Sequence, residues 1–383
     1  MKLLFVTTSL VHGGAERHTI TLANRLAERG HECHLAYVKA DHSQLERLRG
    51  AASVQCLGAR KFLEAKALEA LASAMRSLEP SAVVAVNAYA LLYARLALRR
   101  SGVPAPLVVT WHTTVPRSAK EWLKMVYYRP FFWSADRLVF VCEAQRRYWV
   151  KRLVTGRANE VIYNGVDAES FKFNPAERVA LRRALGYDDK ELVLGMSAVL
   201  RPEKNPVQLV RAVARVRAWG IPARALFIGD GPQRGAVEAA AARLGVAGEV
   251  TITGLQQNVR PLLAACDAVV LCSTAVETFS LAALEALALG RPVVHSQIGG
   301  AAEMIRAGAN GYLFAPNDDD ALAGRIALLA DPQLRHQLGA QARATVETRF
   351  SERAMVERYE TRLQELSIAR RKRGHLRRPA SAH

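Results

Sequence analysis

The chain has 383 residues, of which 50% are hydrophobic and 23% are charged, a balance typical of globular proteins rather than of disordered or fibrous chains. A single hydrophobic core stops growing at about 250–300 residues, so the length predicts two domains. No apolar run reaches the roughly 18 residues of a membrane-spanning helix, and the apolar N-terminus is too short for a signal peptide, so we expect a cytoplasmic protein.

The net charge of +18 is the one unusual bulk property. It predicts an anionic partner: nucleic acid, anionic lipid or a phosphorylated substrate. The five cysteines are odd in number and form no C-x-x-C pair, and the histidines form no H-x-x-x-H cluster. We therefore expect reduced, mostly buried thiols and no structural metal.

Short apolar runs alternate with longer segments of helical period, the pattern of repeated βαβ units. In the first half we expect strands at 2–9, 32–38, 53–57, 82–86, 107–111 and 137–142, and helices at 15–29, 62–78 and 91–100. A polar linker is expected at 167–190. After it we expect strands at 192–199, 225–229, 250–253, 268–272, 292–296 and 311–314. The sequence thus predicts two α/β domains with doubly wound parallel sheets, residues 1–175 and 176–350, and a C-terminal helix with a basic tail over 351–383.

The most informative segment runs from Glu277 to Gly290, after the strand expected at 268–272. Ser280 is a candidate N-cap, and Gly290 a candidate stop, for a short alanine-rich helix that carries Glu285 in its second turn. A helix start offers unpaired N–H groups to an anion such as a diphosphate. Two carboxylates beside that anion would suit a sugar on one side and a ribose on the other. The alternative is a pair of glutamates in solvent on a surface helix.

Other candidate loops also follow predicted strands, where parallel sheets bind ligands. Arg201 and Lys204 follow the strand at 192–199, and two cations there would neutralise a diphosphate leaving group. The alternative is that both side chains are only solvated. His112 follows the strand at 107–111 and could bond a sugar hydroxyl or lend its backbone carbonyl.

Two glycine turns complete the candidate loops. Residues 12–17 contain Gly13 and Gly14, which would let the backbone approach a ligand closely at a helix start. Residues 229–232 form a further turn at a strand end, and a simple tight turn explains it as well as a binding role does.

Taken in order, these residues resemble the retaining family 4 glycosyltransferases over roughly residues 1–350. The resemblance rests on the segments 13–17, 164–167, 201–204, 229–232 and 299–303, and on Glu277 with Glu285 eight positions later. It implies the GT-B fold, in which two Rossmann-like domains face a central cleft. It also implies transfer from a nucleotide sugar with retained anomeric configuration, with neither an obligatory metal nor another cofactor.

The resemblance also implies roles for individual residues. Glu277 would bind the donor hexose and Glu285 the ribose, while Lys204 would hold the diphosphate. Gly14, beside Gly13, would approach the diphosphate from the first domain, and His112 would lie beside the transferred sugar. The remaining substrate-binding positions are backbone groups at the helix start and residues lining the nucleotide base, namely Phe279, Ser280, Leu281, Gly254, Leu255 and Val259.

One position departs from the family pattern. The family usually has an arginine five residues before the lysine, and Val199 stands there in this chain. Arg201 is the candidate for the second cation. Because no carboxylate is placed as a covalent nucleophile, we hypothesise that the acceptor hydroxyl attacks from the face of the departing phosphate, which accepts its proton.

Residues 117–157 hold ten Arg or Lys against three Asp or Glu, interleaved with aromatic residues that include Trp122, Tyr127, Tyr128, Phe131, Phe132, Trp133 and Trp149. Such a surface predicts docking on anionic lipid headgroups, aided by the basic tail at 370–378. The alternative is that the aromatic rings are core and the arginines a solvated face. We expect a peripheral enzyme on the inner face of the cytoplasmic membrane. Its acceptor would be a lipid-linked or lipopolysaccharide-type glycan and its donor a UDP-hexose.

Two other classes of function compete with this reading. A nucleic-acid-binding protein would suit the basic charge, but the motifs of the common binding modules are missing. A nucleotide-sugar epimerase would keep the fold, and release of free nucleotide only when an acceptor is present would distinguish a transferase from it. A dehydrogenase would use one of the Rossmann units, but the G-x-G-x-x-G fingerprint of dinucleotide binding is absent.

Overall fold

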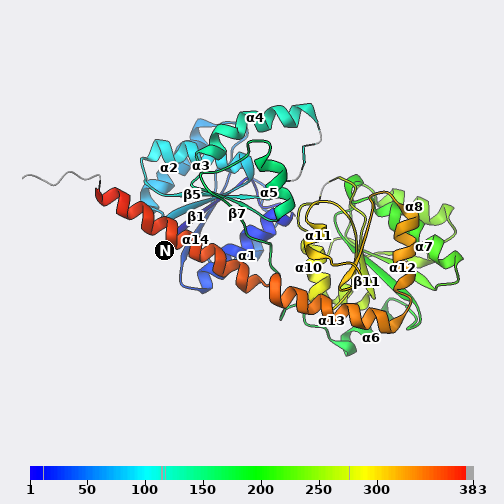
Figure 1. Ribbon diagram of the computed structural model, residues 1–383. Coiled ribbons are helices and arrows are strands. Elements are labelled where there is room, and N and C mark those ends of the chain that lie inside the picture. Colours follow the sequence, from blue (N-terminus) through cyan, green and yellow to red (C-terminus); the bar gives the residue numbers. More distant parts are fainter. Residues whose placement is uncertain (12, 114, 117, 276, 377–383) are drawn as a thin grey trace, which may run out of the picture. The chain divides into compact units, whose positions relative to one another are not determined.

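The computed structural model describes residues 1–11, 13–113, 115–116, 118–275 and 277–376 (Figure 1). Three of the segments singled out in the sequence lie partly outside them: the first glycine turn at His12, the basic segment at Arg117, and the tail beyond residue 376. The chain divides into two compact units. The first unit is Met1–Tyr163 with the chain from Met355 onward, and the second unit is Asn164–Ala354. Among the described helices, none combines the length and apolar character that crossing a bilayer requires.

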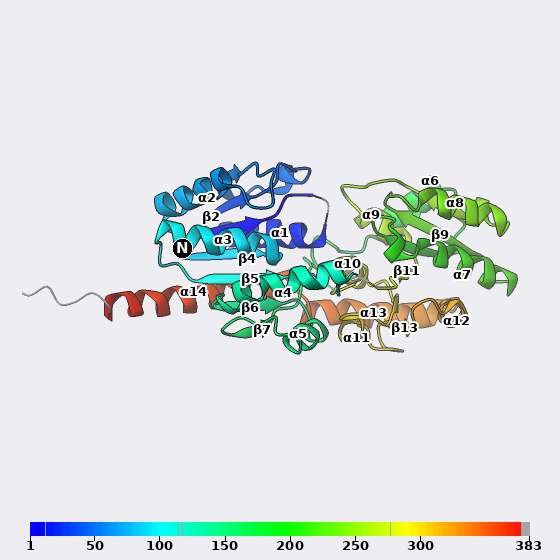
Figure 2. The same cartoon turned by 90° about the horizontal axis from the view of Figure 1, so that it is seen from above.

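The first unit is built on a seven-stranded parallel sheet of order β3-β2-β1-β4-β5-β6-β7, and Figure 2 shows its strands following one another across the unit. The strands are β1 (Lys2–Thr7), β2 (Glu32–Tyr37), β3 (Ala51–Cys56), β4 (Ala82–Val86), β5 (Leu107–Trp111), β6 (Arg137–Phe140) and β7 (Asn159–Val161). The helices are α1 (Gly14–Glu28), α2 (Ala65–Leu78), α3 (Asn87–Ser101), α4 (Ala119–Trp133), α5 (Glu143–Val150) and most of α14 (Glu352–Leu376). A short 3₁₀ turn, η1 (Leu45–Arg47), follows β2.

Helices cover both faces of this sheet, which explains why its strands are apolar throughout. Leu4 and Val6 of β1 pack in one core cluster with residues of α2, α3 and α4. Leu3 and Phe5, which point to the opposite face, pack with residues of α1 and with Tyr359 of α14. Figure 1 shows these two sets of helices on either side of the sheet.

The second unit repeats the design with a six-stranded parallel sheet of order β10-β9-β8-β11-β12-β13. Its strands are β8 (Leu192–Ser197), β9 (Ala223–Ile228), β10 (Val250–Ile252), β11 (Ala268–Leu271), β12 (Val293–Ser296) and β13 (Gly311–Phe314). Its helices are α6 (Pro175–Ala184), α7 (Pro206–Ala218), α8 (Arg234–Arg243), α9 (Arg260–Ala265), α10 (Leu281–Ala288), α11 (Ala301–Met304), α12 (Asp319–Leu328) and α13 (Pro332–Arg349). The 3₁₀ turns are η2 (Pro202–Lys204) and η3 (Ala247–Glu249).

The chain passes from one unit to the other twice, and the two segments near these crossings are hydrogen-bonded to each other. The backbone N–H of Val166 donates to the carbonyl of Phe350 at 3.0 Å, and the N–H of Glu352 donates to the carbonyl of Val166 at 3.0 Å. The unit boundaries lie at 163/164 and 354/355, whereas the sequence analysis placed them at 175/176 and 350/351. The segment expected as a linker, 167–190, belongs to the second unit and contains α6.

A buried carboxylate fixes α6 to the second sheet. Asp267, at the start of β11, accepts from Arg178 at 2.7 Å, from Arg182 at 3.0 Å and from the backbone N–H of Val193 at 2.8 Å. Arg182 is only 2% exposed and also donates to the carbonyls of Asp188 and Glu191. The guanidinium groups of α6 are therefore compensated within the core rather than by water.

We predict that Asp267→Asn lowers the free energy of unfolding by about 3–5 kcal/mol, because it leaves two largely buried guanidinium groups without their counter-charge. Urea unfolding followed by circular dichroism measures this. The matched control is Asp320→Asn, since Asp320 is 83% exposed and pairs with Arg215 at the surface. The control should cost about 1 kcal/mol or less, and equal losses in the two variants would contradict the prediction.

Candidate functional site

The strongest candidate site in the second unit lies at the carboxyl ends of β8 and β11. The strand order reverses between these neighbours, and such a switch point is where open parallel sheets bind ligands. The chain leaves β8 into η2 and leaves β11 into the loop 272–280. The two loops are joined directly, because the N–H of Thr274 donates to the carbonyl of Glu203 at 2.9 Å. The fold thus brings the predicted Arg201–Lys204 and Glu277 segments together.

Lys204 and Glu277 form an ion pair at this switch point. The Nζ of Lys204 lies 2.5 Å from Oε2 of Glu277, and Oγ of Ser273 donates to the same oxygen at 3.1 Å. The Glu277 side chain is 11% exposed and that of Lys204 is 26% exposed. Burial raises the pKa of Glu277, but the charges of Lys204 and His295, with the two hydrogen bonds, outweigh it, and the net pKa is lowered. Glu277 is therefore an ionised acceptor of hydrogen bonds at neutral pH.

The loop after β12 holds the backbone of Glu277. Gly299 has φ +54°, and a Cβ there would lie 1.9 Å from the Glu277 carbonyl oxygen. The N–H of Gly300 donates to the carbonyl of Thr278 at 2.8 Å. Only glycine fits at position 299, because any Cβ there would collide with the Glu277 carbonyl. The loop therefore packs against the backbone of Glu277 and Thr278.

The start of α10 forms as the sequence predicts. Ser280 is the N-cap, and its Oγ accepts from the N–H of Ala283 at 3.3 Å. Phe279 is buried, with its ring 5.4 Å from that of Phe350 and its carbonyl accepting from the Asn164 side chain at 3.2 Å. Glu285 lies in the second turn and is 1% exposed. The prediction of a helix over this segment is confirmed, and Glu285 is not the solvated glutamate of the alternative reading.

The glycine turns of the second unit pack beside the loop that follows β8. A Cβ at Gly229 would lie 1.9 Å from the carbonyl oxygen of Ala198, and one at Gly231 would lie 2.6 Å from that of Leu200. Gly254 has φ +73°, and the position of its Cβ is 3.9 Å from the Asp230 carboxylate.

The other predicted residues of this edge differ in exposure. Leu255 is 65% exposed, and Val259 is the N-cap of α9. Arg201 is exposed, and within the described chain it forms no salt bridge. Val199, at the position of the family arginine, is half-buried. Arg201 is thus an exposed cation three residues before Lys204 in the chain.

The corresponding edge of the first unit carries Gly13, Gly14 and His112. The strand order reverses between β1 and β4, and β5 lies next to β4. Gly13 is the N-cap of α1, and a Cβ there would lie 2.3 Å from Oε2 of Glu16. The N–H of His112 donates at 2.9 Å to Oδ1 of Asn87, which begins α3 directly after β4. The chain after β5 is thereby held to the end of β4.

Sequence reasoning missed the ring of His18, which packs against both His112 and Tyr359. The ring of His18, on α1, lies 4.6 Å from the ring of His112, and the ring of Tyr359, on α14, lies 5.5 Å from His18. His18 is 3% exposed and Tyr359 is 1% exposed. Burial lowers the pKa of His18 to about 4, and burial followed by the charge of His18 holds the pKa of His112 well below its usual value. Both imidazoles are therefore neutral at pH 7.

We predict that this histidine pair makes the fold sensitive to acid. The unfolded chain takes up a proton on His18 near pH 6.5, whereas the folded chain resists protonation until about pH 4, so stability falls as the pH drops through this window. The wild type should lose about 3 kcal/mol more than His18→Leu between pH 6.5 and 4. Urea unfolding at both pH values measures the difference, and parallel losses in the two proteins would rule out this role for His18.

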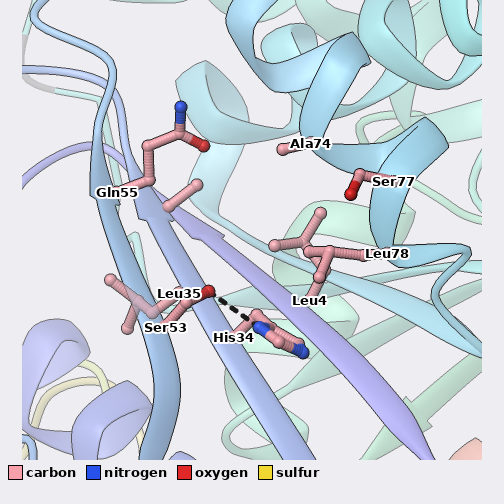
Figure 3. Close-up of a pocket in the computed structure, with 9 residues that line it drawn as sticks. Leu4, His34, Leu35, Ser53, Gln55, Ala74, Ser77 and Leu78 are labelled. Atoms are coloured by element: carbon pink, nitrogen blue, oxygen red, sulfur yellow. Dashed lines mark hydrogen bonds between the residues drawn. The ribbon is translucent and has the colours of Figure 1, made fainter.

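The hollow drawn in Figure 3 lies elsewhere in the first unit, between β2, β3 and α2. Its volume is about 190 Å³, and one wall carries His34, whose ring nitrogens bond Ser53 at 2.7 Å and Glu32 at 3.1 Å. None of the predicted site residues lines it. Across the described residues, no group of three or more His, Cys, Asp or Glu side chains could hold a metal ion. All five cysteines are free.

Known protein families match both units. Residues 12–170 match the family described as Glycosyltransferase Family 4, and residues 177–345 match Glycosyl transferases group 1. The second match contains Lys204, Glu277 and Glu285, and the first contains Gly13, Gly14 and His112.

Curated relatives are similar over part of their length. Over 203 residues the chain is 32% identical to N-acetyl-alpha-D-glucosaminyl L-malate synthase of Bacillus anthracis, covering 53% of this chain and 52% of that protein. Over 190 residues it is 37% identical to D-inositol 3-phosphate glycosyltransferase of Stackebrandtia nassauensis, covering 46% and 42%. The chain thus spans about half the length of the curated relatives it matches.

Solved structures are similar over nearly the whole chain. HepE of Anabaena in complex with UDP is 25% identical and superposes with a TM-score of 0.85, covering 95% of this chain and 100% of that one. The complex of the same protein with UDP-glucose has a TM-score of 0.84 at the same coverage.

Proposed function

We propose that this chain, which belongs to the glycosyltransferases and has the GT-B fold, transfers a hexose from a nucleotide sugar to an acceptor hydroxyl. The observation that carries the proposal is the Lys204–Glu277 pair at the switch point of the second sheet. A cation and an ionised carboxylate side by side suit a ligand that is anionic at one end and hydroxylated at the other. A sugar diphosphate has both properties.

The donor in this proposal is a UDP-hexose. HepE of Anabaena, which has been solved with UDP and with UDP-glucose, supports this choice. When the donor binds, Lys204 would leave its ion pair with Glu277 and pair with the diphosphate. The Glu277 carboxylate would then accept hydrogen bonds from the hexose hydroxyls. The backbone N–H groups of residues 279–281 would face the sugar and phosphate at the start of α10.

The remaining predicted residues complete the donor site in this proposal. Arg201 supplies the second cation, and Glu285 binds the ribose hydroxyls. Gly254, Leu255 and Val259 line the base. From the first unit, Gly14 approaches the diphosphate, and neutral His112 bonds a hydroxyl of the transferred sugar.

The reaction would retain the configuration at the anomeric carbon. The acceptor oxygen forms a bond to C1 on the face from which the phosphate departs, the C1–O bond to the phosphate breaks, and the acceptor proton passes to a phosphate oxygen. Lys204 and Arg201 stabilise the negative charge that grows on the diphosphate. Such catalysis needs no covalent intermediate with the protein.

For the acceptor, we propose a membrane-associated glycan of the lipopolysaccharide or surface-polysaccharide type. The support is the basic and aromatic composition of residues 118–157. A small anionic hydroxy compound is the second candidate, because the names of two relatives specify malate and inositol 3-phosphate.

We predict that Lys204→Ala and Glu277→Gln each lower kcat/KM by at least about 100-fold, the typical cost of removing one preorganised charge from an active site. Release of free nucleotide is measured over a panel of UDP-, GDP- and ADP-sugars with candidate acceptors. Lys190→Ala, at an exposed lysine of the same unit, is the matched control and should stay at the wild-type rate. Near wild-type turnover in both site variants would refute the assignment.

The stereochemistry gives an independent prediction. The new glycosidic bond should have the anomeric configuration of the donor, as read from the proton coupling of C1 in the NMR spectrum of the product. An inverted product would refute the same-face mechanism while leaving the donor site intact.

A further inference from the structure

Helix α4 is apolar on two opposite faces. Met125, Tyr128 and Phe132 lie on the inner face, in the core of the first unit. Leu123 is 72% exposed, and Val126, Tyr127 and Trp133 are each about half exposed. Their spacing of three and four residues puts them on one outer stripe. A surface helix normally presents polar residues there, so an apolar outer face indicates a partner.

This finding divides the aromatic residues of the basic segment. Four of the nine are buried in the core, and three more are partly buried against it: Tyr128, Phe132, Phe140, Trp149, Trp122, Phe131 and Tyr148. Tyr127 and Trp133 remain as exposed rings on the outer stripe. The alternative that the rings belong to the core therefore holds for most of them. The surface open to a partner includes only the exposed part of the basic segment.

The loop before α2 extends the apolar surface. Phe62 is 54% exposed and Leu63 is 44% exposed. The ring of Phe62 lies 6.2 Å from that of Tyr127 and 5.5 Å from that of Tyr89. A depression of about 400 Å³ between this loop and α4 is lined by Phe62, Lys120, Leu123, Lys124, Tyr127 and Tyr128.

Cations border this apolar surface. Exposed basic side chains stand on both elements: Arg60, Lys61, Lys66, Lys120 and Lys124. None of them takes part in a salt bridge within the part of the chain that the structure describes. The nearby Glu64 accepts from the backbone N–H groups of residues 60 and 61. Against these five cations stand the carboxylates of Glu64 and Glu121, so the surface combines apolar side chains with a net positive charge.

We propose that the outer stripe of α4 and the loop 60–63 dock on an anionic lipid bilayer. Leu123, Val126 and Phe62 enter the boundary between headgroups and acyl chains, and Lys120 and Lys124 contact the lipid phosphates. This inference goes beyond the transfer reaction and does not depend on it. The amino-acid composition suggests a membrane contact without locating it, and this inference locates it on α4 and the loop 60–63.

Other occupants fit the surface less well. A second copy of the chain in a symmetric pair would place the lysines of one stripe against those of the other. A nucleic acid would satisfy the lysines but would leave the aliphatic side chains of Leu123 and Val126 without an apolar partner. A bilayer rich in anionic lipid accounts for both features.

The test is co-sedimentation of the full chain with vesicles of phosphatidylcholine, with or without phosphatidylglycerol, at low salt. The wild type should bind the anionic vesicles, and the bound fraction should fall as the salt concentration is raised. Leu123→Ser with Val126→Ser, and separately Lys120→Glu with Lys124→Glu, should each weaken binding by at least about tenfold. If the serine pair fails to fold, the charge-reversal pair, at exposed positions, carries the test.

Matched control pairs lie at exposed positions of the second unit. They are Val179→Ser with Leu328→Ser, and Lys172→Glu with Lys190→Glu, and both should bind as the wild type does. Equal binding to neutral and anionic vesicles, or unchanged binding in the α4 variants, would overturn the proposal. So would sedimentation velocity showing a dimer that the α4 variants break and no vesicle binding by the wild type. The α4 variants should still release nucleotide with a soluble acceptor, so failure here is distinguishable from failure of the proposed transfer reaction.

Discussion

The reversal of strand order beside the first strand of each sheet is the constraint on which the candidate site depends. At β1/β4 and β8/β11, successive connections leave toward opposite faces, so the loops at the carboxyl ends diverge and leave that edge accessible. In the second unit this geometry sets η2 beside the loop that carries Glu277. In the first unit it sets Gly13, Asn87 and His112 at one edge. The same topological rule therefore produces both groups of candidate residues.

The two edges differ in their electrostatics. In the second unit, an ionised Glu277 is matched by Lys204, and the backbone of the carboxylate residue is held by a loop that only Gly299 permits. In the first unit, burial keeps His18 and His112 uncharged. In the proposed reaction, the charged edge would bind the phosphorylated part of the donor, and the neutral imidazole would bond a hydroxyl without adding charge.

The net charge of +18 is distributed in two different ways. Many arginines are used inside the fold, as Arg178 and Arg182 are at Asp267, where they hold α6 to the sheet. The lysines of α4 stand at the surface beside an apolar stripe instead. The total charge therefore predicts little by itself, because the same residue type stabilises the core in one place and is available to a partner in another.

The sequence by itself determined the features that depend on near neighbours. Hydrophobic periodicity predicted most strands and the two-unit α/β plan, and local capping chemistry predicted the helix after Ser280. It missed the short β7, whose residues Asn159–Val161 include a single apolar side chain, whereas the equally short β10 has two and was predicted. Only the tertiary structure decided that Lys204 bonds Glu277, 73 residues away, that His18 packs against both His112 and Tyr359, and that α4 keeps an apolar face outside. Strand order and burial bring these residues together, and both depend on long-range packing that no local pattern records.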